Sequence, residues 1–479
     1  MKRQKELKQY FTPPEVAEFM VRNSTLGSPA KVIDPAVGEG VFLEALLRHG
    51  CQELWGIDLD QDILRQNRNR FRGKAGVHLF HGNALRLQDF PELKSNSFDL
   101  AIGNPPFSNQ KNKVEDYSIL QHFFLRGARQ SVEILFLERF IQLVKPGGLI
   151  RIILPINIFS NSNLQYVRNF IISNLQIEAV VSLPRNIFRY TSAKTAILFG
   201  KKAVMLPGSL LGAQSYAVKL ITIAHKRDVS ALPQLTIRGD QTGVWKELDE
   251  IQFRMDPDYH EAKARVSVYL DSPKYPFKTL SQLASIHNGF TKYGEHLKKI
   301  YPRADARKNG TYIRLIKAKN ISATGFVFEP KSFFIRKDED LYKRQACAKR
   351  GDVLVVRVGV GCAGRTACVI QDRYLGQVDD WIFILRTQLL DPAFLCFYLN
   401  SSIGQEFMKM EKQGTGTVSI SKSKLGNIPV PMLSKKAQSE FQEGVVKMYT
   451  ANSSGNASLS RKIFKELDTK LENLLRREG

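Results

Sequence analysis

The sequence has 479 residues, of which 43% are hydrophobic, enough for two or three domains with buried cores. Its 70 Lys and Arg residues exceed its 46 Asp and Glu residues, and the resulting net charge of +24 favours a polyanionic partner. The five cysteines form no CxxC pair and the eight histidines show no metal-ligand spacing, which argues against a disulfide framework and a metal site.

Neither the N-terminus nor the most apolar stretch predicts a secreted or membrane protein. Residues 1–9 are polar and lysine-rich, with no apolar segment behind them. The most apolar run, residues 134–159, is interrupted by charged residues, proline and glycine, too often for a membrane span. We therefore expect a cytoplasmic, nucleoid-associated protein without membrane contact.

Residues 31–104 repeat an order of strand, loop and helix. The strands are predicted at Lys31–Asp34, Glu53–Leu59, Val77–Phe80 and Phe98–Gly103. Each strand ends at, or shortly before, an acidic, amide or glycine residue. Alternating strands and helices predict a mostly parallel, Rossmann-like α/β sheet, in which ligands bind beyond the carboxyl ends of the strands. The four polar strand ends therefore predict a single pocket.

The remaining elements divide the chain into three parts. A helix is predicted at Ile134–Val144, stopped by Pro146-Gly147-Gly148, followed by strands at Leu149–Leu154, Ile177–Ser182, Lys194–Phe199 and Tyr216–Ile223. After an irregular polar region, short β-rich runs follow at Val353–Val358, Thr366–Ile370 and Trp381–Leu385, then a linker at Ala451–Ser460 and a charged helix at Lys462–Arg477. We predict an α/β domain at 1–245, an α+β domain at 246–433 and a helical segment at 434–479.

A glycine loop follows the first strand and opens a helix. It has the sequence Asp34-Pro35-Ala36-Val37-Gly38-Glu39-Gly40, and its glycines let the backbone approach a ligand closely. The next acid at a strand end, Asp58, lies about 20 residues further on, where a carboxylate can bind a ribose diol. The loop and acid alone suit a nicotinamide dinucleotide as well as another nucleoside cofactor.

The sequence Asn104-Pro105-Pro106-Phe107 after the fourth strand favours methyl transfer. Two prolines remove two amide donors, so the neighbouring carbonyls, together with the Asn104 side chain, can accept hydrogen bonds from an exocyclic amine. Such acceptors make the amine's lone pair available for reaction. Phe107 can stack on a base, which must be flipped out of a duplex to reach the pocket.

These motifs resemble those of a known family. The glycine loop and the Asn104–Phe107 sequence resemble motifs I and IV of amino-methyltransferases, and Gln9-Tyr10-Phe11-Thr12-Pro13-Pro14-Glu15 is similar to motif X. Their order resembles that of gamma-class adenine-N6 DNA methyltransferases, the N-6 DNA methylase family, over about residues 5–230. The resemblance implies transfer of a methyl group from S-adenosyl-L-methionine to N6 of adenine in double-stranded DNA.

The resemblance also implies roles for individual residues. Thr12 would contact the methionine part of S-adenosyl-L-methionine, the loop from Asp34 to Gly40 would wrap it, and Asp58 would hold its ribose. Asn83 would meet its adenine N6, although the family often has Asp at that position. Phe107 stands where the family also uses Tyr. A second base-stacking aromatic is expected at Phe188, with Tyr190 as the alternative.

The C-terminal half resembles a target-recognition domain of type I restriction specificity subunits. The motifs that carry this resemblance are Arg254-Met-Asp-Pro-Asp-Tyr259, Leu280–Ile286, Asn288–Lys292, Gly351–Gly359, Gly414–Ser421 and Leu425–Pro431. One recognition unit is present where a specificity subunit usually has two, and the last helix resembles the spacer helix of those subunits. The cations predicted to contact DNA are Lys292, Arg314, Lys317, Lys319, Arg357 and Arg365.

Several alternatives remain open at the level of sequence. The Asn104–Phe107 motif also occurs in enzymes that methylate adenine N6 in RNA or a glutamine amide in a protein. The chain could instead be a non-catalytic, sequence-specific DNA-binding protein. A fused nuclease is not expected, because the ExK sequence Glu261-Ala-Lys263 has no suitable Asp-bearing strand before it. The expected partners are DNA and either a second copy of the chain or a separate restriction endonuclease subunit.

Overall fold

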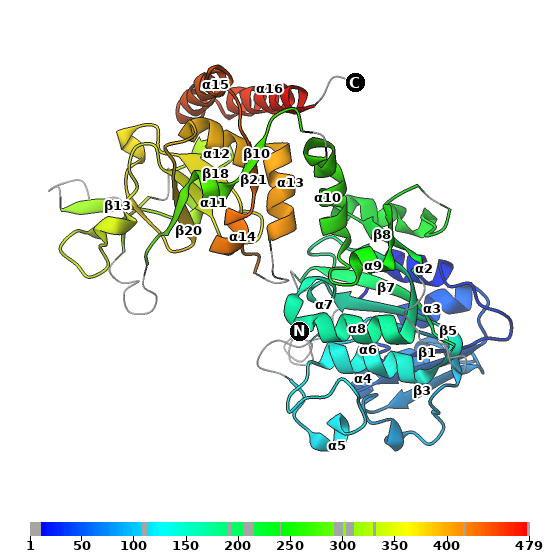
Figure 1. Cartoon of the computed structure of the whole chain (residues 1–479). Helices are drawn as coiled ribbons and strands as arrows, with labels where there is room; N and C mark the ends of the chain where they lie inside the picture. Colours follow the sequence, from blue (N-terminus) through cyan, green and yellow to red (C-terminus); the bar gives the residue numbers. More distant parts are fainter. Residues whose placement is uncertain are drawn as a thin grey trace. The chain divides into compact units, whose positions relative to one another are not determined.

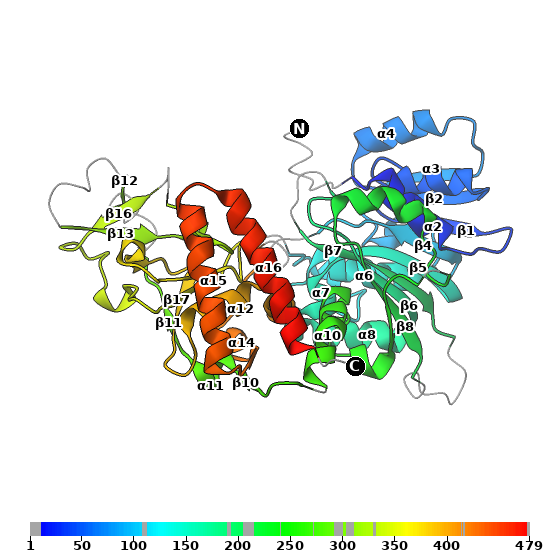
Figure 2. The ribbon, with the colours of Figure 1, turned by 90° about the horizontal axis from the view of Figure 1, so that it is seen from above.

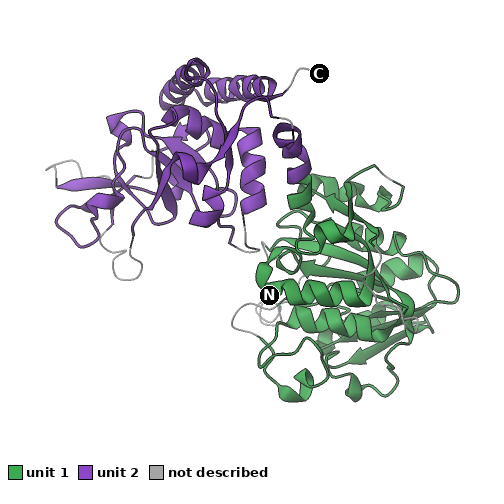
Figure 3. Ribbon diagram, viewed as in Figure 1, with its two compact units in different colours: residues 1–261 green, residues 262–479 purple. Residues whose placement is uncertain are grey.

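The computed structural model describes residues 11–107, 113–188, 193–204, 215–239, 241–271, 273–291, 300–302, 311–328, 332–412, 414 and 417–476. The chain divides into two compact units, residues 1–261 and 262–479 (Figure 3). The division falls within helix α10 (Pro257–Leu270), rather than at residue 245. The expected third part, 434–479, belongs to the second unit and contributes residues to its hydrophobic core.

Unit 1 is built on a nine-stranded sheet in the order β3-β2-β1-β4-β5-β7-β6-β8-β9. All neighbouring pairs from β3 to β5 are parallel, whereas β7 and β9 run antiparallel to their neighbours, so the sheet is mixed and mostly parallel. The strands are β1 (Lys31–Asp34), β2 (Glu53–Asp58), β3 (Val77–His81), β4 (Phe98–Gly103), β5 (Val144–Pro155), β6 (Leu175–Ser182), β7 (Thr195–Lys202), β8 (Ala217–Thr222) and β9 (Val244–Glu247).

Helices cover both faces of this sheet because alternate strand residues point to opposite sides. In β1, Val32 joins the core cluster that includes residues of α2 (Pro14–Arg22) and α3 (Val41–Arg48), whereas Ile33 joins the cluster of α6 (Val132–Leu143) and α8 (Gln165–Asn174) (Figure 1). The other helices of unit 1 are α4 (Gln61–Arg70), α5 (Tyr117–Leu120), α7 (Asn157–Ser160) and α9 (Leu248–Ile251). Unit 1 is therefore a three-layer α/β structure.

The helix expected at Ile134–Val144 ends within one residue of its predicted end, but Pro146-Gly147-Gly148 does not lie in the loop after it. Helix α6 ends at Leu143, and the segment Pro146-Gly147-Gly148 lies inside strand β5, which already starts at Val144. Gly147 has a φ of +79°, and β4 pairs with β5 with a register shift at this point. The proline and glycines therefore shape an irregular strand start.

Unit 2 has an α+β architecture. Its larger sheets have the orders β11-β20-β17-β18 and β12-β16-β13-β19. The strands are β10 (Phe277–Thr279), β11 (Ser285–Asn288), β12 (Tyr301–Pro302), β13 (Tyr312–Ile316), β14 (Ile321–Ser322), β15 (Gly325–Phe326), β16 (Phe333–Arg336), β17 (Val353–Val356), β18 (Thr366–Cys368), β19 (Gln377–Val378), β20 (Ile382–Arg386) and β21 (Pro429–Pro431). The helices are α11 (Leu280–Leu283), α12 (Pro392–Asn400), α13 (Ser402–Glu411), α14 (Lys422–Gly426), α15 (Lys435–Ser453) and α16 (Ala457–Leu475).

The expected linker at Ala451–Ser460 is also wrong, because it forms the turn of a helical hairpin. Helices α15 and α16 lie side by side (Figure 2), and a Cβ at Gly444 of α15 would come within 2.6 Å of the Leu467 side chain of α16. Ser460 donates a hydrogen bond across the turn to the carbonyl of Met448, at 3.0 Å. Small polar residues here allow close helix packing. None of the helices in the described part of the chain combines the length and apolar character of a membrane span.

Candidate active site

A cavity of about 350 Å³ lies where strands β1, β2, β3 and β4 of unit 1 end. It is lined by eleven of the residues predicted from the sequence, namely Thr12, Pro35, Ala36, Val37, Gly38, Asp58, Asn83, Asn104, Pro105, Pro106 and Phe107. The carboxyl ends of neighbouring parallel strands meet at one edge of a sheet, which brings these separate segments together. Asp34 and Gly40 support the loop from outside the cavity lining.

The glycine loop needs its glycines for two different reasons. Gly38 has a φ of +50° and lines the cavity, and a Cβ there would meet only the Ala36 carbonyl, at 3.9 Å, so it leaves room for a ligand. Gly40 has a φ of +77° and caps α3, and a Cβ there would come within 2.7 Å of the Asn67 side chain. Asn67 in turn donates to the Gly38 carbonyl at 2.6 Å and fixes the loop.

Asp58 is held in place by two backbone amides. Its Oδ2 accepts a hydrogen bond from the Gly38 amide and its Oδ1 one from the Asp60 amide, each at 2.8 Å. Burial raises the pKa of Asp58, while these two amides act in the opposite direction. Each carboxylate oxygen keeps a second lone pair, so the side chain can still accept hydrogen bonds from a ligand diol.

Asp34 is buried beneath the loop. Its Oδ1 accepts from the Ala36 amide at 3.0 Å, whereas its Oδ2 has no hydrogen-bond partner among the described residues. Burial raises the pKa of Asp34 to about 8; the Ala36 amide opposes this shift and Asp58 adds to it. A Cβ at Gly103 would come within 2.6 Å of Asp34 Oδ1, which explains a glycine at the end of β4.

The segment Asn104–Phe107 forms one wall of the cavity. Asn104 donates a hydrogen bond from Nδ2 to Thr12 Oγ1 at 3.1 Å, which sets the orientation of the amide and turns its oxygen away from Thr12. Phe107 lines the cavity and is 7% exposed. Asn83 also lines the cavity, with its Oδ1 accepting from the Leu85 amide at 3.0 Å.

The cavity also has an apolar wall that the sequence did not single out. Residues from the start of α6 and the segment before it contribute this wall, including Val114, Ile119, Val132 and Phe136. Phe136 is the aromatic residue that the α6 side brings to the cavity. Helix α6 is buried on nearly all sides, so its sequence gave no signal for which apolar residue faces a ligand.

Phe188 does not line this cavity. It is 2% exposed and belongs to the same core cluster as Ile187 and Phe199. Its side chain is therefore used for packing in this conformation, because the strand-to-strand connection carries it into the core. Tyr190, the alternative, lies outside the described residues.

The cations predicted to contact DNA lie in unit 2 in three settings. Arg314 lies over the ring of Phe328, and Lys317 and Lys319 lie over the ring of Phe333, at 3.8–4.6 Å from the ring centres. Arg357 lies over the Phe383 ring at 5.2 Å. Arg365 lines a separate cavity. Lys292 lies outside the described residues.

The fold and the cavity together show that unit 1 is an α/β domain with a Rossmann-like ligand site at the carboxyl edge of its sheet. Residues 1–211 match the family model described as N-6 DNA Methylase. This match covers the N-terminal part of the chain and agrees there with the predicted resemblance to N-6 DNA methylases.

Individual relatives are similar over the same region. The Type II methyltransferase M.HincII of Haemophilus influenzae is 27% identical over 182 residues, covering 36% of this chain and 33% of that protein. The Type I restriction enzyme EcoEI methylase subunit of Escherichia coli is 25% identical over 215 residues, covering 40% of this chain and 42% of that protein. The chain thus spans about a third to two fifths of the length of these relatives.

Solved structures with a similar backbone include the type IIG restriction endonuclease BpuSI. It aligns with 95% of this chain and 64% of its own at a TM-score of 0.46 and 14% identity. A type I restriction-modification system methyltransferase subunit from Streptococcus thermophilus aligns with 52% of this chain and 58% of its own, at a TM-score of 0.42 and 19% identity.

Proposed function

We propose that this chain is a gamma-class, site-specific DNA methyltransferase that transfers the methyl group of S-adenosyl-L-methionine to N6 of adenine. The observation that carries the proposal is that the glycine loop, Asp58 and the Asn104–Phe107 segment line one cavity. A nucleoside-binding loop next to a rim of oxygen acceptors suits transfer to an amine. The N-6 DNA Methylase match over residues 1–211 supports the same reaction.

The residues present fit the cofactor. Gly38 leaves space beside the loop backbone, Asp58 offers carboxylate lone pairs for the ribose hydroxyls, and Asn83 offers an amide for the adenine edge. S-adenosyl-L-methionine supplies an activated methyl group when bound. Asp34 Oδ2, which has no hydrogen-bond partner among the described residues, belongs to the residue that begins this loop. When Asp34 is ionised, its negative charge would attract a cationic ligand.

The acceptors at the rim would act on the target amine. The Asn104 amide oxygen, with a carbonyl of the proline segment, would accept hydrogen bonds from the two N6 protons of adenine. This draws the nitrogen lone pair out of conjugation with the ring and aims it at the donor. The Phe107 ring would stack on the flipped base, with Phe136 on the apolar side of the cavity excluding water.

We further propose that unit 2 recognises the DNA target, as its resemblance to type I specificity subunits implies. Lysine and arginine side chains of this unit would contact phosphates, which agrees with the net charge of +24. The chain would work in a restriction–modification or related defence system, in the cytoplasm with the nucleoid, as a homodimer or with a separate endonuclease subunit.

The test is methyl transfer from labelled S-adenosyl-L-methionine to plasmid DNA, with RNA and a glutamine-containing protein substrate in parallel. We expect label on DNA, in N6-methyladenine. Asn104→Ala should lower the transfer rate by about a hundredfold or more while cofactor binding, measured by calorimetry, stays within about twofold. Asn69→Ala, on the exposed side of α4, is the matched control and should behave like the wild type.

The outcomes separate the alternatives. Label on RNA or protein but not on DNA would overturn the substrate. DNA binding without any transfer would support a non-catalytic DNA-binding protein. Equal loss of cofactor binding and transfer in Asn104→Ala would refute the role given to Asn104.

A further inference from the structure

A second cavity, of about 360 Å³, lies within unit 2. It is lined by the loop that follows β17, by residues at the end of α12 and on α13, and by Val418. The residues that matter for its chemistry are Gly359, Gly361, Arg365, Gln405 and Lys412. Nothing in the proposed methyl-transfer site uses this cavity.

Two of the sequence motifs meet at the cavity. The end of the Gly351–Gly359 motif pairs with the end of the Gly414–Ser421 motif, through hydrogen bonds from the Gly359 amide to the Val418 carbonyl and from the Ile420 amide to the Arg357 carbonyl, both at 2.9 Å. These contacts fix the base of the loop 359–364. The pairing gives a physical reason for two glycine-containing motifs about 60 residues apart.

The loop has a backbone that only glycine adopts easily. Gly359, Gly361 and Gly364 have φ values of +137°, +75° and +89°. A Cβ at Gly364 would come within 2.9 Å of both Cε and Nζ of Lys412, so the loop is shaped to admit the lysine head group. In the described part of the chain, the amides of Val360 and Gly361 take no part in the loop's own hydrogen bonds.

The two cations at the cavity have no carboxylate partner among the described residues. Within the described segments, Lys412 Nζ donates to the neutral oxygen of Gln405, at 3.4 Å, and neither it nor the Arg365 guanidinium forms an ion pair. The two acids of α13 have other partners: Glu406 pairs with Arg265 at 3.2 Å and with Lys409 at 2.6 Å, and Glu411 pairs with Lys424 at 3.1 Å. A partly buried ammonium without an anion is unfavourable, so an external negative charge would stabilise this site.

The electrostatic surroundings of Lys412 also favour a bound anion. The pKa of Lys412 is lowered to about 8, mainly by burial and also by the nearby charges of Lys409 and Arg365, while Cys362 and Glu406 act in the opposite direction. An anion bound between Lys412 and Arg365 would restore the full charge of the lysine. The fork of Arg365 and the point charge of Lys412 suit the oxygens of a phosphate group.

We infer that this cavity is a phosphate-binding site that grips one phosphodiester of the DNA backbone. The inference rests on the proposed function, since it assigns the phosphate to DNA bound by unit 2. Such a contact would hold the duplex in register without reading its sequence. A free inorganic phosphate has the same chemistry, and the experiment below distinguishes the two sources.

The experiment measures binding of a fluorescein-labelled, random-sequence duplex to the full chain by anisotropy over a series of salt concentrations. Lys412→Met should reduce the slope of log affinity against log salt by about 0.9 and the affinity at about 0.1 M salt by about eightfold, the effect of one lost phosphate contact. Lys412→Arg should keep most of the affinity. Lys409→Met, one helical turn away and paired with Glu406, is the control and should leave the slope unchanged.

Each outcome decides between specific claims. If Lys412→Met and Lys409→Met both bind like the wild type, while the wild type still binds and methylates DNA, the phosphate site is refuted and the proposed function stands. If the wild type does not bind DNA at all, the proposed function fails first. If inorganic phosphate raises the melting temperature of the wild type but not of Lys412→Met, while their DNA affinities agree, the site binds free phosphate and the DNA assignment is overturned.

Folding of the variants is checked independently. The circular dichroism spectra of Lys412→Met and Lys409→Met should match that of the wild type. Gly364→Ala provides a second probe, since its Cβ would displace the Lys412 head group. It should reproduce the loss of slope seen in Lys412→Met without removing a charge, and a wild-type slope in this variant would contradict the geometry.

Discussion

The buried carboxyl group of Asp34 lowers the folding stability of the protein in a pH-dependent way. Its carboxyl group is fully buried, and only one of its oxygens has a hydrogen-bond partner in the described structure. Between the ordinary pKa of 3.8 and the raised value of about 8, the folded protein binds a proton that the unfolded chain has released. The carboxyl group therefore costs stability increasingly as the pH rises through this window, up to about pH 8.

The change Asp34→Asn should remove this cost. We expect the melting temperature of the variant to exceed that of the wild type by a margin that grows from about pH 5 to pH 8 and is constant above, equivalent to a few kcal/mol. Calorimetry across this pH range is the measurement. Asp89→Asn, at an exposed position, is the control. A difference in melting temperature that does not vary with pH would show that Asp34 is ionised throughout.

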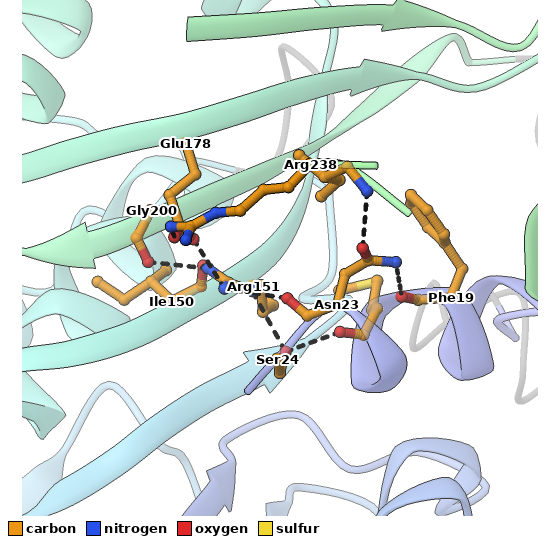
Figure 4. Close-up of polar contacts among 10 residues, drawn as sticks. Phe19, Asn23, Ser24, Ile150, Arg151, Glu178, Gly200 and Arg238 are labelled. Atoms are coloured by element: carbon orange, nitrogen blue, oxygen red, sulfur yellow. Dashed lines mark hydrogen bonds and ion pairs between the residues drawn. The ribbon is translucent and has the colours of Figure 1, made fainter. Parts of the chain in front are cut away.

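At the scale of elements, the polar groups inside unit 1 fasten its helices to the sheet. Arg151 lies on β5 and is 2% exposed, and it donates hydrogen bonds to the carbonyls of Asn23 and Gly200 and to Ser24 Oγ, at 3.0–3.2 Å. It also pairs with Glu178 of β6 at 2.8 Å. Figure 4 shows these contacts converging on the arginine, which therefore ties three strands to the end of α2.

Replacing Arg151 by Met should destabilise unit 1 strongly. Among the described residues, the change leaves Glu178 with only the exposed Arg238 as a partner. It also removes the donors for the buried Gly200 carbonyl and the partly buried Asn23 carbonyl, and the total loss is about 3–5 kcal/mol. Urea unfolding followed by circular dichroism measures it. The matched control is Arg238→Met, which removes an 85% exposed arginine from the same glutamate and should cost less than about 1 kcal/mol. Similar losses in the two variants would show that the buried network contributes little.

The motif at 254–259 has a structural role in the same unit. Asp258 accepts hydrogen bonds from Ser182, at the end of β6, at 2.7 Å, and from Lys194, just before β7, at 2.5 Å. Arg254 pairs with Asp256 at 2.6 Å, and Asp256 accepts from the Tyr259 amide. The sequence suggested this motif as the entry to a recognition domain, and the structure shows that it fastens the start of α10 to the sheet of unit 1.

At the scale of the whole molecule, each unit has hydrophobic clusters of its own among the described residues. The clusters that contain the nine-stranded sheet use residues of unit 1, and those of the two larger unit 2 sheets use residues of unit 2. Each unit thus has the buried core that a cooperative folding unit needs.

We expect two thermal transitions in differential scanning calorimetry. S-adenosyl-L-methionine should raise the transition temperature of unit 1 alone. At a concentration of 100 times its dissociation constant, it should add about 2.7 kcal/mol to the free energy of unfolding of that unit. The Asp58→Ala variant, which lacks the carboxylate next to Gly38, is the comparison and should show a much smaller shift. A single transition that shifts as a whole on ligand binding would mean that the two units unfold together.

The local pattern of the sequence was sufficient for the strands and loops around the site. Strands β1 and β4 have the predicted bounds, because a short apolar run followed by acid, glycine or proline defines both the strand and its end. The loops after parallel strands must meet at one edge, so the motifs also predicted which segments share the cavity.

Only the tertiary structure decided which side chains face a ligand and which charges are buried. Phe188 and Phe136 are both aromatic residues in apolar surroundings, yet only Phe136 lines the cavity. Nothing in the local sequence distinguishes Arg151 from the other arginines, or Lys412 from the other lysines. In the fold, Arg151 is buried by residues distant in the chain, whereas Lys412 has no carboxylate partner among the described residues. Burial and pairing depend on contacts between remote segments, which local periodicity does not contain.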